Sequence, residues 1–214
     1  MEIIGCKGVN LSAWREKRTP KYTRQALCDA FRAGENPPME LFWGHQPARD
    51  GRITNSCLSQ WWISEFWFHG LRMCCMEQCM MWGKAQIFED EEIAKKILEC
   101  DDPQKIKKLG RQVRSFDQQT WDEVKYALIL EGNYSKFTHN DELRRFLLST
   151  GDSVLVEASP YDCVWGVGLG AATPDVKDPH KWRGENLLGF ALMEVRDEIR
   201  RAYENEALCC GAGE

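Results

Sequence analysis

The sequence lacks long apolar runs. No segment approaches the roughly 20 consecutive apolar residues needed to cross a bilayer. No apolar signal segment occurs near the start, where Met1 to Pro20 mixes Gly, Lys, Arg and Trp. We therefore expect a cytoplasmic or nuclear protein with no membrane partner. The 214 residues also contain no internal repeat or low-complexity segment, and this length fits one domain with a sizeable core.

Metal and disulfide patterns are also missing. The 10 cysteines include no CxxC pair, and the 4 histidines are scattered. We therefore expect reduced, largely buried thiols, no metal and no cofactor. His69 with Cys74 or Cys75 remains an alternative set of metal ligands. The scattered histidines also argue against a Ser–His or Cys–His nucleophile.

Positive charge is in deficit, with 28 Lys and Arg against 33 Asp and Glu and a formal net charge of -5. This balance argues against a general nucleic-acid coat, although it leaves room for a local basic pocket. Aromatic residues are plentiful instead, with 9 Trp and 9 Phe. Such side chains serve both cores and ligand walls, and their number alone does not separate the two uses.

The most informative stretch is the predicted helix over residues 76–88. At about 100° per residue, Glu77 and Lys84 lie on the same apolar face as Met80 and Met81. Two turns separate the two charges by roughly 10 Å along the axis, too far for a direct helical ion pair. Burying them without partners is unfavourable. Either they are paired elsewhere in the core, or they line a cleft.

Capping signals and periodicity predict several helices. Thr19 as N-cap with Pro20 at the first helical position predicts one start, and the capping box from Thr120 to Glu123 predicts another. Asn140 and Asn186 are predicted to cap two later helices. The predicted helices cover residues 20–33, 76–88, 90–100, 103–114, 120–137, 140–148 and a last segment after Asn186.

Two short segments read as strands. Phe66-Trp67-Phe68 is followed by the turn His69-Gly70, and the β-branched run over residues 154–159 predicts a buried strand. The second strand leads into a loop over residues 160–170. Asp162 lies in that loop, just beyond the strand, where functional residues tend to occur.

The same loop contains Gly166, Gly168 and Gly170. A dinucleotide fingerprint needs GxGxxG opening a helix, whereas Thr173-Pro174 follows here, so a Rossmann fold is not expected. The glycines permit backbone N–H groups to approach a ligand closely. A purely structural turn is the alternative.

A basic cluster lies on the helix predicted over residues 103–114. Most such clusters are solvated faces. Arg111 stands apart because it follows Gly110 and its planar guanidinium can bind a pyrophosphate through two hydrogen bonds. The cluster comprises Lys105, Lys107, Lys108, Arg111 and Arg114.

Four stretches, taken together, resemble the NADAR domain, the YbiA-like N-glycosidase family. With LFWGH and LSQWW upstream, they follow one another in order over about residues 41–200. The stretches are MEQCMMWGKAQIF, KKLGRQVRSFDQQTW, GNYSKFTHNDELRRFLLSTGDSVLVEASPYDCVWGVGLG and WRGENLLGFALMEVR. The resemblance implies a single compact α+β domain, predominantly helical. We expect an N-terminal extension with one helix over residues 1–38, a catalytic domain over 39–205 and a tail over 206–214.

The resemblance also implies hydrolysis of N-glycosidic bonds at ribose C1′. Some family members act on phosphorylated riboflavin-pathway intermediates, and others remove ADP-ribose from modified guanine in nucleic acid. The EQCMM motif, together with Arg111 and the glycine loop, favours ADP-ribosylated guanine in DNA or RNA as substrate of a monomeric enzyme. A riboflavin-type substrate and a non-catalytic ADP-ribose-binding module are the alternatives.

Matched by position, the family's catalytic residues correspond to Glu77, Lys84 and Asp162. Many relatives carry His after the glutamate, where this chain has Gln78, a variant that occurs with the MMxxKA pattern seen here. Residues expected to line the ADP-ribose pocket are Phe42, Trp43, Gly44, Trp61, Arg111, Trp121, Trp165, Gly166, Gly168, Trp182 and Asn186.

A chemistry follows from the three catalytic positions. Cleaving a ribosyl–base bond develops positive charge at C1′, which a carboxylate stabilises while an acid protonates the leaving base. Glu77 and Asp162 are expected to divide these tasks. Lys84, desolvated among methionines, should have a lowered pKa and act as an amine nucleophile. We hypothesise a transient Schiff base between Lys84 and the ring-opened sugar.

Overall fold

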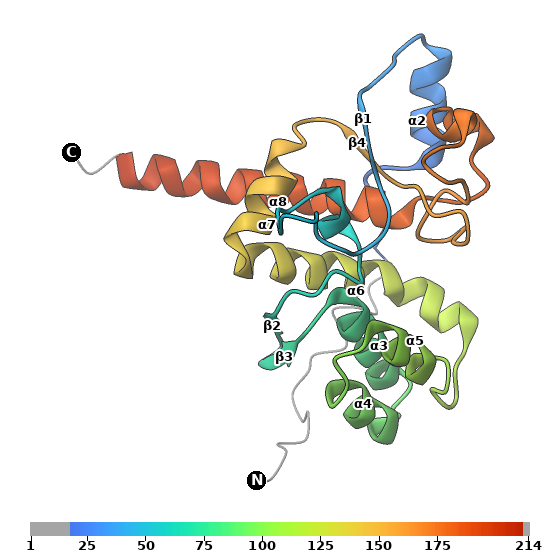
Figure 1. The fold of residues 1–214 in the computed structure, drawn as a ribbon, viewed down its shortest axis with the longest axis vertical. Coiled ribbons are helices and arrows are strands. Elements are labelled where there is room, and N and C mark those ends of the chain that lie inside the picture. Colours follow the sequence, from blue (N-terminus) through green and yellow to red (C-terminus); the bar gives the residue numbers. More distant parts are fainter. Residues whose placement is uncertain (1–17, 212–214) are drawn as a thin grey trace.

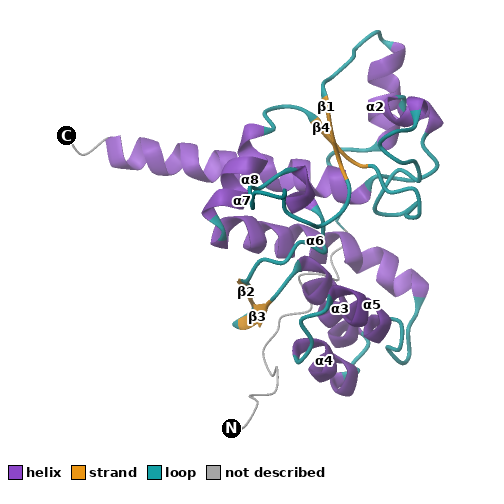
Figure 2. Ribbon diagram, viewed as in Figure 1, coloured by secondary structure: helices purple, strands orange, loops and turns teal. Residues whose placement is uncertain are grey.

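The computed structural model of the chain describes residues 18–211, with side chains as far as residue 204. The first 17 residues of the predicted N-terminal extension lie outside it. Helices dominate and strands are short (Figure 2), which confirms the predicted α+β, predominantly helical class. The helices are α2 (Arg24–Arg32), α3 (Met76–Ile87), α4 (Glu91–Leu98), α5 (Pro103–Gly110), α6 (Gln118–His139), α7 (Asp141–Ser149) and α8 (Leu187–Gly211). Short 3-10 helices are η1 (Asn55–Leu58), η2 (Pro174–Lys177) and η3 (Pro179–Lys181).

The strands form two two-stranded sheets. β1 (Met39–Phe42) pairs in parallel with β4 (Val154–Glu157), and β2 (Phe66–Phe68) pairs antiparallel with β3 (Leu71–Met73). The predicted strand at 66–68 and its His69-Gly70 turn are therefore confirmed. In the parallel pair Phe42 lies opposite Glu157, so the segments that follow both strands leave the sheet at the same edge.

The helices pack in layers around α6 (Figure 1). On one side α6 contacts α3, which also packs against α4 and α5; on the other side it contacts α8, which covers β4. This arrangement gives one continuous hydrophobic core that runs from α3 through α6 to α8. Among the helices of residues 18–211, none has the length and apolarity required to cross a membrane.

Helix α3 is buried on nearly all sides, because neighbouring helices cover more than the one face that its periodicity predicts. Every residue from Met76 to Gly83 is buried. Gln78 is held by three hydrogen bonds: its amide oxygen accepts the N–H of Cys74, and its amide nitrogen donates to the carbonyls of Ile97 and Cys100. Gln78 thus ties the start of α3 to the end of α4 and faces away from solvent.

Two predicted helix starts are wrong. α6 begins at Gln118 with Asp117 as N-cap, whose carboxylate accepts the N–H and the hydroxyl of Thr120. The predicted cap, Thr120, therefore lies inside the first turn, because an aspartate three residues earlier accepts the free backbone N–H. α2 likewise begins at Arg24 rather than Pro20, because the side chain of Thr23, its N-cap, accepts the backbone N–H of Ala26.

The segment around α2 docks onto the rest of the domain. The Tyr22 hydroxyl donates to Asp197 of α8 at 2.6 Å, and the backbone N–H of Lys21 donates to Glu194 at 2.6 Å. Arg24 donates through Nε to the carbonyl of Pro179 in η3. Residues 21–24, predicted as part of an extension, thus bind the surface of α8 and η3.

Candidate active site

Two adjoining pockets of about 400 Å³ and 450 Å³ share Lys107, Arg111 and Asp162 and so form one cleft. The first lies among α3, α5, the start of α6 and the loop after β4. The second lies between the segments that follow β1 and β4. A third pocket of about 590 Å³, between residues 50–53 and α7, contains none of the predicted site residues.

Glu77 lies in the first turn of α3 and is 1% exposed. Its N–H donates to the carbonyl of Gln60, and one carboxylate oxygen accepts the indole N–H of Trp61 at 3.0 Å. Within the described chain its other oxygen is buried without a hydrogen-bond partner. Burial raises the pKa of Glu77 to about 6, although nearby Lys107 and the Trp61 hydrogen bond act in the opposite direction.

Lys84 lies two turns further along α3 and lines the same pocket. Its Nζ donates to the carbonyl of Gly110 at 2.9 Å and lies 4.0 Å from the Phe116 ring centroid. Burial lowers the pKa of Lys84. Gly110 is required for this contact, because a Cβ there would lie 2.0 Å from the Met81 sulfur. The glycine thus lets α5 approach α3 closely enough for its carbonyl to reach the amine.

Asp162 lines both pockets from the loop after β4. Its Oδ1 accepts the backbone N–H groups of Val164 and Trp165, at 2.9 Å and 2.8 Å. This side-chain turn folds the loop back on itself and places Trp165 against the cleft. Asp162 therefore has a structural part in shaping the wall as well as a carboxylate in the site.

Glu157, the last residue of β4, is a cleft residue that the sequence analysis missed. Its Oε2 is buried with no hydrogen-bond partner among residues 18–211. Burial raises the pKa of Glu157 to about 8; the charges of Asp162 and Glu77 act in the same direction and Lys107 opposes them. The available signal was a single charged residue ending an otherwise apolar strand.

The basic cluster does not lie on one helix, because α5 ends at Gly110 rather than at the predicted residue 114 and Arg111 and Arg114 follow it. Lys107 and Arg111, one turn apart, line the cleft, and the Lys107 amine lies 5.5 Å from the Trp61 ring centroid. Arg114 instead binds the buried carboxylate of Asp90 through Nε and Nη2, an ion pair that lowers the pKa of Asp90. Arg111 thus lies where expected, and Lys107 joins it.

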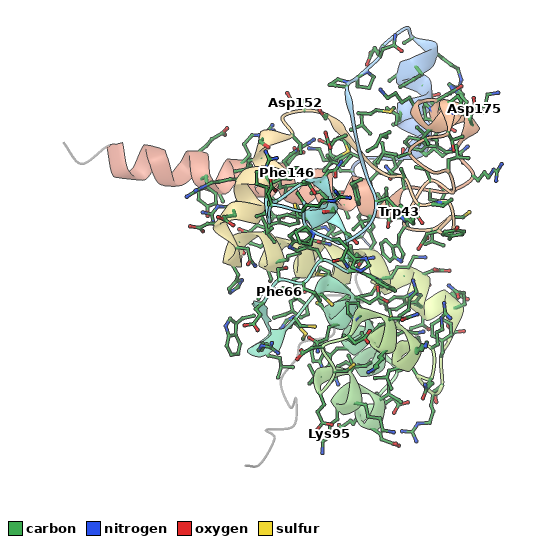
Figure 3. The ribbon with its side chains drawn as sticks, viewed as in Figure 1. Trp43, Phe66, Lys95, Phe146, Asp152 and Asp175 are labelled. Atoms are coloured by element: carbon green, nitrogen blue, oxygen red, sulfur yellow. The ribbon has the colours of Figure 1, made fainter. Side chains whose placement is uncertain are left out.

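Most of the predicted site residues meet in this cleft. Trp43 follows β1, is 57% exposed and lines the second pocket (labelled in Figure 3). Trp61 lines the same pocket, with its ring centroid 5.4 Å from that of His45. The predicted residues that line the cleft are Glu77, Lys84, Asp162, Trp43, Gly44, Trp61, Arg111, Trp121 and Trp165.

Five predicted binding residues do not line either pocket: Phe42, Gly166, Gly168, Trp182 and Asn186. Phe42 is 1% exposed and belongs to the core at the end of β1. The Trp182 indole is buried and donates to the carbonyl of Val176 at 2.7 Å. Both rings belong to the hydrophobic core and line neither pocket.

Asn186 is fully buried and connects α8 to β4. Its side-chain oxygen accepts the N–H of Glu157, and its side-chain nitrogen donates to the carbonyl of Leu155, both at 2.9 Å. A Cβ on Gly189 would lie 2.0 Å from that same carbonyl, so the glycine allows this close approach. Asn186, expected to bind substrate, instead positions the strand that carries Glu157.

The glycine loop packs against its own protein. The N–H of Val167 donates to the carbonyl of Glu157, and the N–H of Gly168 donates to that of Asp162. A Cβ on Gly184 would lie 2.2 Å from the carbonyl of Gly166. The glycines therefore allow residues 162–170 to pack tightly against residues 183–188. This is what the alternative of a purely structural turn predicts.

The alternative metal ligands do not converge. His69 Nε2 lies 3.0 Å from a carboxylate oxygen of Glu131, while Cys74 and Cys75 are buried free thiols. Among the described residues, no cluster of three or more His, Cys, Asp or Glu side chains is arranged to hold a metal ion.

Comparisons with known proteins agree with the geometry. The chain matches the NADAR domain over residues 41–200. It is 48% identical over 122 residues to N-glycosidase R617 of Acanthamoeba polyphaga mimivirus, covering 57% of this chain and 72% of the relative. It is 30% identical over 116 residues to N-glycosidase YbiA of Escherichia coli (strain K12), covering 54% and 66%. Protein irg-1 of Caenorhabditis elegans is 37% identical over 131 residues, covering 60% and 62%.

The fold is similar to the NMR structure of the E. coli protein YbiA, with a TM-score of 0.62 and 23% identity over 89% of this chain and 94% of that one. N-glycosidases are hydrolases of N-glycosyl compounds, and the chain is an enzyme of this class. The matched span contains the entire cleft. The chain therefore belongs to the NADAR domain family.

Proposed function

We propose that this N-glycosidase cleaves the bond between ribose C1′ and guanine in ADP-ribosylated DNA or RNA and releases ADP-ribose. One observation carries the proposal: a single cleft joins the buried carboxyl of Glu77 and the shielded amine of Lys84 to the basic pair Lys107 and Arg111. The first two groups supply chemistry at C1′. The basic pair supplies the charge that a diphosphate requires.

The shape of the cleft supports a ligand with two parts. Two pockets of about 400 Å³ and 450 Å³ adjoin at the basic pair, so a substrate that spans them can place its ribose in the first, beside Glu77 and Lys84, and its leaving base in the second. The diphosphate attached to that ribose then lies near the junction, where the basic pair is. Trp43 and Trp61 in the second pocket offer flat apolar faces for a nucleobase.

The two cations are suited to different parts of the diphosphate. Arg111 is exposed at the end of α5 and presents a planar fork of N–H donors. Lys107 is half-buried and supplies a compact charge between the two pockets. Such a local basic pair is compatible with a chain whose net charge is -5.

Lys84 and Glu77 then carry out the reaction. The unprotonated amine of Lys84 attacks C1′, the C1′–N bond breaks, and its electron pair leaves with the base, which takes up a proton. Glu77, with its pKa raised to about 6, is mostly ionised at neutral pH and accepts the proton released by the new amine bond. The C1′–O4′ bond then breaks, its electron pair passes to O4′, and O4′ takes the proton held by Glu77, which leaves a protonated Schiff base that water hydrolyses to ADP-ribose and free Lys84.

A phosphorylated riboflavin-pathway intermediate is the second candidate. The pocket beside α3, about 400 Å³, has room for a ribose phosphate, and either cation suffices for a single phosphate. Because the chain is an N-glycosidase, the non-catalytic binding module is set aside.

The substrate is tested by incubating the protein with ADP-ribosylated guanine in a DNA oligonucleotide, the same in RNA, and phosphorylated riboflavin intermediates. Chromatography measures free ADP-ribose or ribose 5-phosphate, and Glu77→Gln serves as the low-activity control. We expect ADP-ribose from the guanine substrates. Release of ribose 5-phosphate alone would replace the proposal with the second candidate.

The covalent step is tested separately. Borohydride added during turnover should reduce the Schiff base and leave a mass adduct on the peptide that contains Lys84. The Lys84→Arg variant should give none. An active enzyme without any adduct would exclude the covalent step and leave direct attack by water.

A further inference from the structure

Glu157 is a cleft carboxyl that the mechanism above does not use. It lines the second pocket together with Trp61, Lys107 and Asp162. Its Oε2 is buried and has no hydrogen-bond partner in the described structure. Buried polar atoms are nearly always satisfied, so an unsatisfied one in a cleft has room for a hydrogen bond from a ligand or from water.

The backbone of Glu157 is fixed on both sides. Its N–H donates to the Asn186 side chain at 2.9 Å, and its carbonyl accepts the N–H of Val167 at 3.0 Å and that of Ser159 at 2.8 Å. Gly166 packs so closely that a Cβ there would lie 2.9 Å from the same carbonyl. The loop and the start of α8 thus hold the end of β4 in one position, which a precisely placed functional group requires.

Two other buried charged groups, Asp90 and Lys136, are different. The Asp90 carboxylate accepts hydrogen bonds from the backbone and side chain of Arg114 and from Ile93. Lys136 donates to two backbone carbonyls. These groups are satisfied within the protein and so have structural roles, whereas Glu157 retains an oxygen that the protein leaves without a partner.

Neighbouring charges help to set the pKa of Glu157 apart from that of Glu77. Asp162 from the loop and Glu77 from α3 raise the pKa of Glu157, and Lys107 from α5 lowers it; Arg111 lies in the same pocket. At neutral pH Glu157 is mostly protonated and Glu77 mostly ionised, given pKa values of about 8 and about 6. Two carboxyl groups whose environments separate their pKa values are a typical acid and base pair.

We infer that Glu157 is the proton donor to the leaving base, while Glu77 acts as the carboxylate at C1′. As the C1′–N bond breaks, its electron pair passes to the base nitrogen and the Glu157 proton is transferred to the same nitrogen. Glu157 is left as a carboxylate and regains a proton from water at the open end of the cleft. This role rests on the proposed N-glycosidase site and replaces the expected division between Glu77 and Asp162.

The test compares wild type with Glu157→Gln on whichever substrate the wild type cleaves. At pH 7 we expect kcat/KM to fall by about 10²- to 10⁴-fold, the usual contribution of a general acid. The wild-type rate should decline above about pH 8, where Glu157 loses its proton, and the residual rate of Glu157→Gln should lack that decline. Glu157→Asp, which keeps an acid, should recover part of the loss.

Controls separate this role from a structural one. Glu157→Gln should keep the wild-type melting temperature and bind free ADP-ribose in calorimetry, and Glu185→Gln, on an exposed nearby loop, should retain full activity. If the wild type is active and kcat/KM of Glu157→Gln lies within fivefold of it, the role of Glu157 as proton donor is overturned while the proposed function stands. The same holds if the variant keeps the decline in rate above about pH 8. A wild type inactive on both substrate classes would overturn the proposed function and the proton donor together.

Discussion

Two lysines in apolar surroundings have different roles in this fold. Lys136 on α6 is 0% exposed, and its amine donates to the carbonyls of Cys57 and Ser59 at 2.7 Å and 2.9 Å. Lys84 is half-buried, has one carbonyl partner and lines the cleft. Burial lowers the pKa of both, to about 8 for Lys136. A lowered pKa therefore makes a lysine only a candidate for catalysis. Lys84 is distinguished from Lys136 because its amine lines a cleft and has N–H donors left for a ligand.

The two lysine regions are nevertheless connected. Lys136 holds the backbone of residues 57–59, and the next two residues, Gln60 and Trp61, both bind Glu77. Lys136 thus supports the wall of the cleft that contains Trp61, while Lys84 lies on the other wall. Variants of the two lysines should separate support from chemistry.

The largest effect is expected for Lys84→Met. Removing the nucleophile should lower kcat/KM by about 10⁴-fold or more, because water must then attack C1′ directly. The melting temperature should change little, since the Gly110 carbonyl is the one hydrogen-bond partner lost. Steady-state kinetics and thermal unfolding measure the two quantities. Activity within tenfold of wild type would remove Lys84 from the mechanism.

Glu77→Gln is expected to have the next largest effect, about 10³-fold in kcat/KM. Glu77 acts as a carboxylate, so wild-type activity should fall as the pH drops below about 6, where the carboxylate is protonated. The glutamine variant should lack this acid limb. The measurement is the pH profile of kcat/KM from pH 4.5 to 8 for both proteins. A decline at low pH that persists in the variant would show that another group causes it.

Lys136 should instead show its effect in stability. Its pKa is about 8 in the folded state against 10.5 ordinarily, so below pH 8 the folded protein carries a charged amine at a penalty. Above about pH 10.5 the amine is neutral in both states and the penalty disappears. The unfolding free energy of wild type relative to Lys136→Met should therefore rise by about 3 kcal/mol between pH 8 and 10.5.

Urea unfolding of both proteins at several pH values measures this difference. Taking the difference removes the titration of tyrosines and cysteines that both proteins share. A difference that stays constant with pH would show that Lys136 titrates normally, and would make the two lysine regions less alike than their burial indicates.

Gly110→Ala should have the smallest effect. The added Cβ must displace Met81, whose sulfur would lie 2.0 Å away, and overpacking of this kind costs about 1–3 kcal/mol. Because Gly110 also carries the carbonyl that binds Lys84, activity should fall by about tenfold. The matched change Gly151→Ala, at an open turn distant from the cleft, should affect stability alone. Equal kinetic losses in both variants would contradict the link to Lys84.

The part of the site carried by α3 was predictable because it is local. Glu77 and Lys84 lie two turns apart on one helix, and helical periodicity places them on a common side without any tertiary information. Helix class and the hairpin turn at His69-Gly70 were predictable for the same reason. Even there, a predicted start such as Thr120 was displaced, because Asp117 offered an equally good cap earlier in the chain.

The remainder depended on contacts between distant segments. Glu157 ends a strand that looks like core, and only the parallel pairing with β1 shows that its side chain lies in the cleft. Asn186 and Gly184 are residue types that permit close contacts with a backbone or a ligand. The sequence does not show which of the two lies against them, and in the structure it is the protein's own backbone. Lys107 could not be distinguished from the other lysines of α5 for the same reason.

The docking of residues 21–24 has a consequence for the limits of the folding unit. The family match begins at residue 41, yet Tyr22 and Lys21 bind acidic side chains of α8, the helix that covers β4. A chain cut to the matched span would leave Glu194 and Asp197 without these partners. The packing unit therefore begins about twenty residues before the span that matches the family.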